Sequence, residues 1–212
     1  KMKWEMMERG ISEKHVITSG IPVAPVFSLT KSSHELRIQY KISEDERVIL
    51  VLSGGQGFMK SDDVLELLLK YTFKFPLRII TIAGKNKKLV KRLKKVADVF
   101  QKNNVTVDVV EWTEKIDEYM RIADAVVTKP GGSTTSECIS LGKPMVVMNP
   151  IPGQEEHNAE YIAQKGYGKI VRTATDLLYY VEEYMGETKK NSESKQKKPA
   201  ANIILQKVVG DM

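Results

Sequence analysis

Cysteine and histidine are scarce in this 212-residue sequence. Cys138 is its one cysteine, so no disulfide can form within the chain and a cysteine-rich metal site is excluded. His15, His34 and His157 lie far apart and show none of the spacings typical of metal ligands. We therefore predict no metal site and no bound cofactor. Cys138 falls where a helix interior is expected, and we predict that it is a small buried apolar residue.

Long hydrophobic runs are also missing. No uninterrupted apolar stretch approaches the roughly 18 residues of a membrane span, and no secretory signal is visible. We therefore expect a cytoplasmic protein. The chain begins with Lys1 and its first residues already resemble a helix interior, so we expect a preceding segment in the complete protein. The formal net charge of +6 permits an anionic partner without choosing among nucleotides, lipids and nucleic acids.

Two familiar nucleotide-binding motifs are absent. The glycine cluster at Gly54, Gly55, Gln56 and Gly57 lacks the G-x-G-x-x-G spacing, and no acidic residue suited to a ribose follows the second expected strand. The same cluster lacks the Lys-Ser or Lys-Thr pair of a P-loop. NAD binding and a P-loop ATPase are therefore disfavoured.

Apolar segments of strand length alternate with segments of helical pattern. Residues 48–52 form a continuous apolar run, which is typical of a parallel strand buried on both faces. We expect strands at 48–52, 77–83, 105–110, 124–128, 145–148 and 169–171. We expect helices at 1–9, 32–40, 61–71, 86–100, 116–122, from Ser133 or Thr134, from about Gln154, at 175–185 and at 200–209. This order predicts an α/β fold: a Rossmann-like parallel sheet of about six strands with helices on both faces, plus a C-terminal helix.

Candidate ligand-binding residues lie where the expected strands end. Ligands of parallel α/β sheets bind beyond the carboxyl ends of the strands. Gly54, Gly84, Thr113, Gly131 and Gly153 each follow such an end. We therefore expect the functional site at this edge of the sheet.

The stretch 129–158 contains a pattern suited to an anion. Gly131 and Gly132 let the backbone approach a ligand closely, and the first N–H groups of the following helix have no intrahelical partner. Ser133 and Thr134 add hydroxyl donors. Together these groups predict a seat for phosphate. An ordinary strand-to-helix connection with a Ser or Thr cap has the same pattern, and this alternative remains open.

Further motif residues surround this turn. They are Thr128-Lys129-Pro130-Gly131-Gly132, Glu137, Gly142-Lys143-Pro144, Pro152-Gly153-Gln154-Glu155 and Asn158-Ala159. In this arrangement the sequence resembles the donor-binding half of the GT-B glycosyltransferases. Within that fold it resembles processive diacylglycerol glucosyltransferases and monogalactosyldiacylglycerol synthases, and more distantly the transferase that adds N-acetylglucosamine to lipid I. The resemblance covers roughly residues 20–209.

The resemblance implies that the motif residues bind a UDP-sugar donor. Gly131, Gly132, Ser133 and Thr134 would hold the diphosphate, Glu137 would accept hydrogen bonds from the ribose hydroxyls, and the backbone at Thr113 would meet the uracil. Gln154, Glu155 and Asn158, with Gly153 in the same loop, would face the sugar hydroxyls and the diphosphate. Gly54, Gly55 and Gln56 would line the cleft near the arriving acceptor.

Two of these implied roles have structural alternatives. The run 134–137 fits a capping box, in which Glu137 reaches back to the start of its helix. Gln154, Glu155 and Asn158 fit an ordinary polar first turn, where Glu155 favours the helix dipole. Both alternatives remain open from the sequence.

The resemblance also implies a reaction. Many retaining transferases of this fold carry two acids in a Glu-x7-Glu pair, but Lys129 replaces the first here and only Glu137 is present. We therefore expect an inverting transferase that moves a hexose from a UDP-sugar to a lipid acceptor, most simply diacylglycerol. In this fold the general base comes from a separate N-terminal domain. We therefore assign no catalytic residue here and expect this chain alone to be inactive.

This interpretation divides the chain into three parts. Residues 1–22 would be the tail of the absent domain and a linker, 23–186 the nucleotide-sugar-binding domain, and 187–212 a basic linker with a C-terminal helix. Alternative functions are a non-catalytic nucleotide-sugar-binding module, a transferase of N-acetylglucosamine to a cell-wall lipid precursor, and a UDP-sugar epimerase. The epimerase would need acid–base residues in the cleft that the sequence does not offer.

The segment from Lys85 to Lys95 is strongly basic, with apolar residues at helical spacing. One interpretation is a solvated outer face on a helix packed against the core. The other is attraction to an anionic lipid surface, which suits a lipid acceptor and a peripheral position on the inner face of the membrane. Nucleic acid is disfavoured because no aromatic residues interleave the charges.

Overall fold

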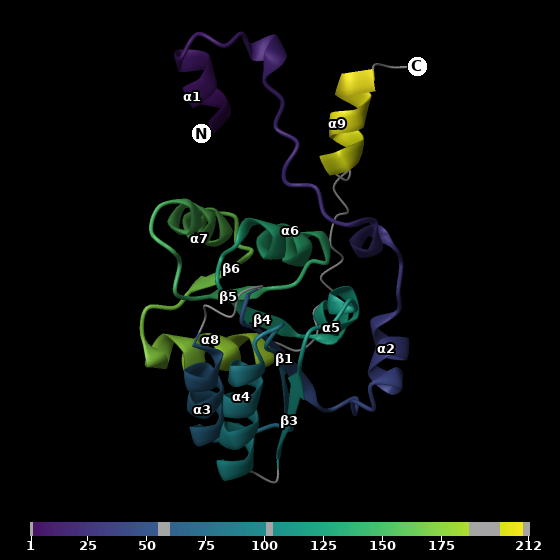
Figure 1. Ribbon diagram of the computed structural model, residues 1–212, viewed down its shortest axis with the longest axis vertical. Helices are drawn as coiled ribbons and strands as arrows, with labels where there is room; N and C mark the ends of the chain where they lie inside the picture. The colour runs from purple at the N-terminus through teal and green to yellow at the C-terminus, as the bar shows by residue number, and fades with distance from the viewer. Residues whose placement is uncertain (1, 55–59, 101–103, 187–199, 210–212) are drawn as a thin grey trace.

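The computed structural model describes residues 2–54, 60–100, 104–186 and 200–209, and within them six strands form one parallel sheet (Figure 1). The strand order is β3-β2-β1-β4-β5-β6. The strands are β1 (Arg47–Leu52), β2 (Leu77–Ile82), β3 (Val105–Val110), β4 (Ala125–Thr128), β5 (Met145–Val147) and β6 (Gly168–Ile170). The predicted Rossmann-like sheet of about six strands is confirmed.

Helices cover both faces of this sheet, as predicted (Figure 1). The helices of the described residues are α1 (Met2–Glu8), α2 (Ser33–Gln39), α3 (Ser61–Lys70), α4 (Lys87–Val99), α5 (Ile116–Ile122), α6 (Gly132–Ser140), α7 (Gln154–Gln164), α8 (Ala174–Gly186) and α9 (Ala200–Val209). Two short 3-10 helices, η1 (Glu13–His15) and η2 (Pro25–Ser28), precede the sheet. The C-terminal helix α9 has the predicted bounds.

The core consists of two apolar clusters, one on each face of the sheet. Ile49 and Val51 of β1 belong to the cluster that α3, α4 and α8 cover. Val48, Leu50 and Leu52 belong to the cluster that η2, α2, α5, α6 and α7 cover. Successive side chains of a strand point to opposite faces, so β1 must be apolar at every position from Val48 to Leu52 to serve both clusters.

Several predicted boundaries are wrong by one or two residues. Helix α6 begins at Gly132, not at Ser133 or Thr134, because its N-cap is Gly131 in an extended conformation. Strand β6 is shifted one residue toward the N-terminus and includes Gly168. A Cβ atom on Gly168 would lie only 2.2 Å from the Met145 carbonyl oxygen, so only glycine lets β6 approach β5 this closely.

The segment before the sheet is attached to the domain. The extended stretch that the sequence predicts ends before Pro25, where η2 begins, and Phe27 of η2 is buried in the core. Arg121 of α5 donates hydrogen bonds through Nη2 to the carbonyl oxygens of Val26, Phe27 and Leu29, at 3.2, 3.2 and 2.7 Å. These bonds hold η2 against α5.

Helices α1 and α9 lie apart from the layers around the sheet, at the end of the molecule where α6 lies (Figure 1). Both expose large apolar side chains, among them Trp4 on α1 and Val208 on α9, which are 62% and 78% exposed. The division at residues 22 and 186 stays a prediction, and the polar segment 187–199 lies outside the described residues. Within the described ranges, every helix falls short of what crossing a membrane requires.

Candidate functional site

The candidate site lies at the carboxyl edge of the sheet, between β1 and β4. There the strand order reverses, because β2 and β3 follow β1 on one side while β4, β5 and β6 extend on the other. Loops that leave adjacent strands in opposite directions open a crevice at such a switch point. Gly54 follows β1 at this point, Lys129 follows β4, and the loop that ends at Gly153 follows β5. Gly55 and Gln56, also predicted for this site, lie outside the described residues.

The turn between β4 and α6 has the geometry of an anion seat. Gly131 donates its N–H to the Lys129 carbonyl oxygen at 2.8 Å, which turns the chain into the helix. No side chain of the described residues caps the first turn of α6. The N–H groups of Gly132, Ser133 and Thr134 therefore begin the helix without a capping side chain, where the helix dipole favours negative charge.

Glu137 lies in the second turn of the same helix. Because the helix begins at Gly132, the capping-box position is Thr134, and the capping-box alternative for Glu137 is excluded. The Glu137 side chain is half-buried, and this burial raises the pKa of its carboxyl. Its carboxylate makes no hydrogen bond or ion pair with any residue in the described part of the chain. Glu137 thus keeps its acceptor capacity for a ligand.

Glu155 joins two of the loops. Its Oε1 lies 2.8 Å from Nζ of Lys129, and its Oε2 accepts the N–H of Ile151 at 2.9 Å. Both carboxylate oxygens therefore contact protein groups, and the side chain is nearly buried. Lys129 in turn lies over Gly54, since a Cβ on Gly54 would meet its Cε at 3.0 Å. This ion pair fixes the loops after β4 and β5 beside the end of β1.

Asn158 makes a second link between the same loops. Its Nδ2 donates to the Pro130 carbonyl oxygen at 2.9 Å, which ties α7 to the turn before α6. Gly153 precedes α7 with a φ of 89°, in the left-handed region that favours glycine, and donates its N–H to Glu156. Gln154 is the first residue of α7. The structure therefore brings Glu155 and Asn158 against the turn before α6, while the ligand-binding roles of Gly153, Gln154, Glu155 and Asn158 stay predictions.

Thr113 lies at the same edge, after β3 and two strands away from β1. Its Oγ1 accepts the N–H of Lys115 at 3.0 Å, which shapes the loop before α5. The neighbouring Trp112 is 54% exposed, and Nζ of Lys85 lies 5.4 Å from its ring centroid. A cation over an aromatic face was not expected from the sequence, because the two residues belong to different loops.

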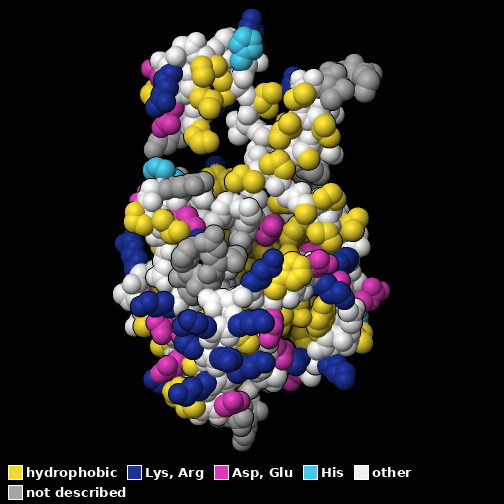
Figure 2. Space-filling model, in the orientation of Figure 1, with side chains coloured by type: hydrophobic (Ala, Val, Ile, Leu, Met, Phe, Trp, Pro, Cys, Tyr) yellow, Lys and Arg dark blue, Asp and Glu magenta, His cyan; other side chains and the backbone are white. Residues whose placement is uncertain are grey.

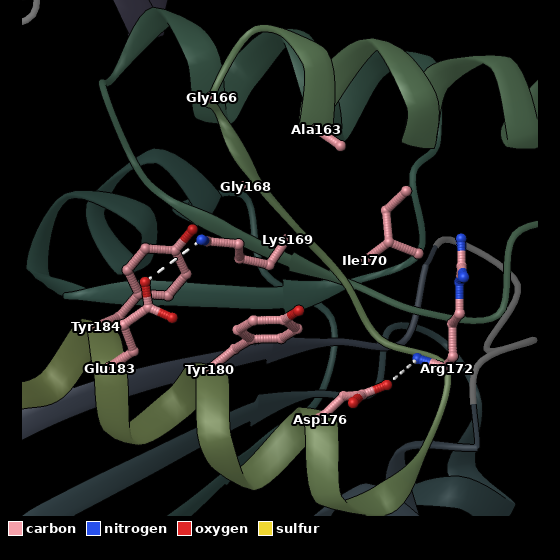
Figure 3. A pocket seen from close by; sticks show the side chains of 10 residues that line it. All are labelled: Ala163, Gly166, Gly168, Lys169, Ile170, Arg172, Asp176, Tyr180, Glu183 and Tyr184. Atoms are coloured by element: carbon pink, nitrogen blue, oxygen red, sulfur yellow. Dashed lines mark hydrogen bonds and ion pairs between the residues drawn. The ribbon is translucent and has the colours of Figure 1, made fainter.

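A cleft elsewhere on the molecule contains none of the predicted site residues. It lies between α7, β6 and α8, at the outer edge of the sheet (Figure 3). Lys169 and Glu183 form an ion pair of 3.4 Å within it, and Asp176 accepts the N–H groups of Arg172 and Thr173 at the start of α8. These contacts satisfy charged groups of the cleft, so the structure does not favour it as the functional site.

Two further contacts were not predicted from the sequence: one lies at the amino edge of the sheet, opposite the site, and the other lies at the start of α6. Nζ of Lys143 donates to the carbonyl oxygens of Arg121 and Ala123, at 2.7 and 2.9 Å, and burial lowers the pKa of Lys143 to about 8. Ile21 lies against Gly132, whose Cβ would be 3.1 Å from its Cδ1. Neither contact has a local sequence pattern. Among the described residues, no three His, Cys, Asp or Glu side chains gather as a metal site requires.

The fold and the position of this site define the class of protein: one half of the GT-B glycosyltransferase architecture. Residues 48–210 match the glycosyltransferase family 28 C-terminal domain. The chain belongs to this family. The resemblance found in the sequence is thereby confirmed.

Curated relatives agree with this assignment. The chain is 29% identical over 214 residues to a processive diacylglycerol beta-glucosyltransferase of Bacillus pumilus, covering 98% of this chain and 55% of the relative. It is 28% identical over 214 residues to a protein of the same description from Bacillus subtilis, with the same coverage. The chain thus spans about half the length of the curated relatives it matches.

Solved structures share the fold at low identity. MurG of Acinetobacter baumannii aligns with a TM-score of 0.63 at 19% identity, over 86% of this chain and 54% of that one. The UDP-GlcNAc 2-epimerase of Neisseria meningitidis, solved with UDP-GlcNAc bound, aligns with a TM-score of 0.61 at 18% identity, over 99% and 58%. At these identities the likeness concerns the fold alone.

Proposed function

We propose that this chain is the donor-binding half of an inverting glycosyltransferase that moves a hexose from a UDP-sugar to a lipid acceptor, diacylglycerol. The acceptor hydroxyl attacks the anomeric carbon, and UDP leaves from the opposite face of the sugar. The general base and the acceptor site would lie in a second domain, for which relatives of nearly twice this length have room. This chain alone would bind the donor without transferring its sugar.

The observation that carries the proposal is the pairing of an uncapped helix start with Glu137. The N–H groups from Gly132 to Thr134 offer hydrogen bonds to the diphosphate and stabilise the charge that develops on it as the sugar leaves. Glu137 lies further along the same helix, and its half-buried carboxylate makes no bond to any described residue, which leaves its oxygens available to ligand hydroxyls. A ribose diol next to a diphosphate fits this spacing, and charged acceptors make the stronger hydrogen bonds.

The remaining site residues complete the proposed donor site. Glu155 would act mainly by holding Lys129 and the loop at Ile151 in place, because both of its oxygens are already engaged. Gln154 and Asn158 would face the sugar, and the Thr113 backbone would meet the uracil. Lys129 adds a positive charge near the turn, which Glu155 neutralises until an anionic ligand arrives.

UDP titration tests the proposal directly. We expect calorimetric binding of UDP, and a weakening of about tenfold or more in Glu137→Ala, since a hydrogen bond to a charged group contributes about 1.5–3 kcal/mol. Glu160→Ala on the exposed side of α7 is the matched control and should bind as the wild type does. Equal affinities for Glu137→Ala and the wild type would contradict the ribose role. UDP-glucose, UDP-galactose and UDP-N-acetylglucosamine then rank the sugars, and the last would favour the cell-wall precursor alternative.

We further propose that the basic face of α4 draws the protein to an anionic lipid surface on the inner side of the membrane. Leu89, Val90 and Leu93 face the core. The exposed basic residues are Lys87, Lys88, Lys91, Arg92, Lys94 and Lys95. Figure 2 shows Lys and Arg side chains gathered over this part of the molecule. A solvated outer face has the same appearance, so only a binding measurement separates the two interpretations.

Vesicle sedimentation separates them. We expect binding to phosphatidylglycerol vesicles but not to phosphatidylcholine, with a loss of about 1 kcal/mol for each basic residue reversed at Lys91 and Lys95. Lys165→Glu, a charge reversal at the exposed residue that follows α7, should have little effect. Equal losses at Lys165 and Lys91 would indicate a general charge effect and reject a role for α4.

A further inference from the structure

Gly132 contacts a residue far from it in the sequence. A Cβ on Gly132 would lie 3.1 Å from Cδ1 of Ile21, closer than most side-chain contacts. Ile21 therefore packs against the first residue of α6, at the start of the proposed diphosphate seat. The rest of the Ile21 side chain remains accessible, since 51% of its surface is exposed.

The chain around Ile21 is held on both sides. Downstream, Arg121 binds the carbonyl oxygens of Val26, Phe27 and Leu29, and Pro22 restricts Ile21 itself to an extended conformation. Upstream, Gly20 has a φ of 81°, and its Cβ would lie 3.9 Å from the Cβ of Ala200, the first residue of α9. Figure 1 shows this segment running past α6 and the start of α9 before it reaches η2. The contact with Gly132 therefore lies just upstream of the segment that Arg121 holds and just downstream of the approach of Gly20 to α9.

Two separate features therefore favour glycine at position 132. A diphosphate requires close approach to the backbone there, and the Ile21 side chain occupies the space that a methyl group would fill. We propose that Ile21 is a positioning residue, which seats the incoming segment on the first turn of α6 and forms an apolar wall of the donor site. The part of this inference that concerns the donor site rests on the proposed function, which supplies the UDP-sugar ligand. The contact itself exists without a ligand and can be tested without one.

The first experiment is a thermal double-mutant cycle on the protein without ligand. Gly132→Ala adds a helix-favouring methyl group, but in the wild type this group meets Ile21. The change should therefore raise the melting temperature more, by roughly 2 °C, in an Ile21→Ala background than in the wild type. Gly131→Ala is the control, because its Cβ would meet only Glu155 Oε1 at 3.8 Å and its effect should not depend on residue 21. If Ile21→Ala and Gly132→Ala changed the melting temperature additively, the contact between Ile21 and position 132 would be rejected.

The second experiment is UDP titration. We expect Ile21→Ala to weaken UDP binding about threefold to tenfold, as contacting groups with coupling energies of this order do. Ile17→Ala removes a similarly exposed isoleucine, at 48%, from the same segment and should leave affinity unchanged. Unchanged or tighter UDP binding by Ile21→Ala would contradict the proposal that Ile21 forms a wall of the donor site. If the wild type itself fails to bind UDP, the proposed function fails while the thermal cycle still decides the contact.

Discussion

The two halves of the sheet are stabilised in different ways. In the first half, β1, β2 and β3 pair in register over six residues each, and their apolar side chains supply much of the core. In the second half, β4, β5 and β6 have only four, three and three residues. With fewer paired strand residues, the loops after β4 and β5 are tied together by polar side chains, through Lys129 and Glu155 and through Asn158 and the Pro130 carbonyl.

Charged groups of the first half lie both inside and at the surface, since Arg78 of β2 is nearly buried and pairs with Glu46 and Asp108. On α4 the basic residues face solvent, and Arg92 pairs with Asp62 at the surface. In the second half, Lys129, Lys143 and Glu155 turn inward and bond to loops and carbonyl oxygens. Strand pairing thus dominates the first half. In the second half side-chain contacts add to it, with Lys129 and Glu155 at the carboxyl edge of the sheet and Lys143 at the amino edge.

The largest effect on stability is expected at the β5–β6 pair, where the two strands pack too closely to accept a side chain. Gly168→Ala places a methyl group against the Met145 carbonyl, a backbone atom that cannot rotate away. We expect a loss of more than about 3 kcal/mol in the free energy of unfolding, measured by urea denaturation. Gly186→Ala is the control, because nothing lies within 4 Å of its Cβ position. A small loss of unfolding free energy in Gly168→Ala would show that β5 and β6 can move apart to accept the methyl group.

Lys143 provides a pH test of the inward-facing charges. Burial lowers its pKa from 10.5 to about 8 in the folded protein. Between these values the unfolded chain binds a proton that the folded chain has lost, so stability rises with pH across this window. Relative to Lys143→Met, the wild type should gain up to about 3 kcal/mol between pH 8 and 10.5, because one pKa unit corresponds to about 1.4 kcal/mol. Parallel stability profiles for the two proteins would contradict this.

Glu155 tests the loop ion pair. Glu155→Ala leaves Lys129 partly buried without its carboxylate, and we expect a loss of about 2 kcal/mol in the free energy of unfolding. The matched comparison is Glu66→Ala, which breaks an exposed pair with Lys70 on α3 and should cost less than about 0.5 kcal/mol. Equal losses in both variants would remove the contrast between the halves.

Asn158 provides the smallest of these tests. Asn158→Ala removes one hydrogen bond to the Pro130 carbonyl and should cost about 1 kcal/mol, measured by thermal unfolding. Asn158→Asp keeps the size but replaces the donor, so it should lose as much or more. An unchanged melting temperature in both would mean that α7 reaches the turn without this bond.

The scaffold was predictable because its signals are local. The apolar run at β1, the helical spacing of Leu89 and Leu93, and the glycines after β1, β2, β4 and β5 all follow from periodicity and backbone conformation. The strand-to-helix turn at Gly131 and Gly132 was also predictable, since adjacent glycines precede a helix start, and its role as an anion site stays a prediction. The exact first residue of α6 was missed, because either glycine could begin the helix.

The contacts around the site were not predictable in the same way. Glu155 fitted the helix dipole or a sugar contact, yet it pairs with Lys129, 26 residues earlier and on another loop. Ile21 and Gly132 likewise meet only once the chain is folded. Such pairs have no shared periodicity, so their partners follow from the three-dimensional arrangement of the loops rather than from spacing.

The burial of Cys138 has a practical consequence. It is the only thiol in the chain, it lies in the core beside Met120 and Ile162, and burial raises its pKa to about 12. The reactive thiolate is therefore scarce at neutral pH and shielded from reagents. A cysteine introduced on the exposed surface of α9 or α1 would be the one that takes a dye or spin label, without removal of the native residue.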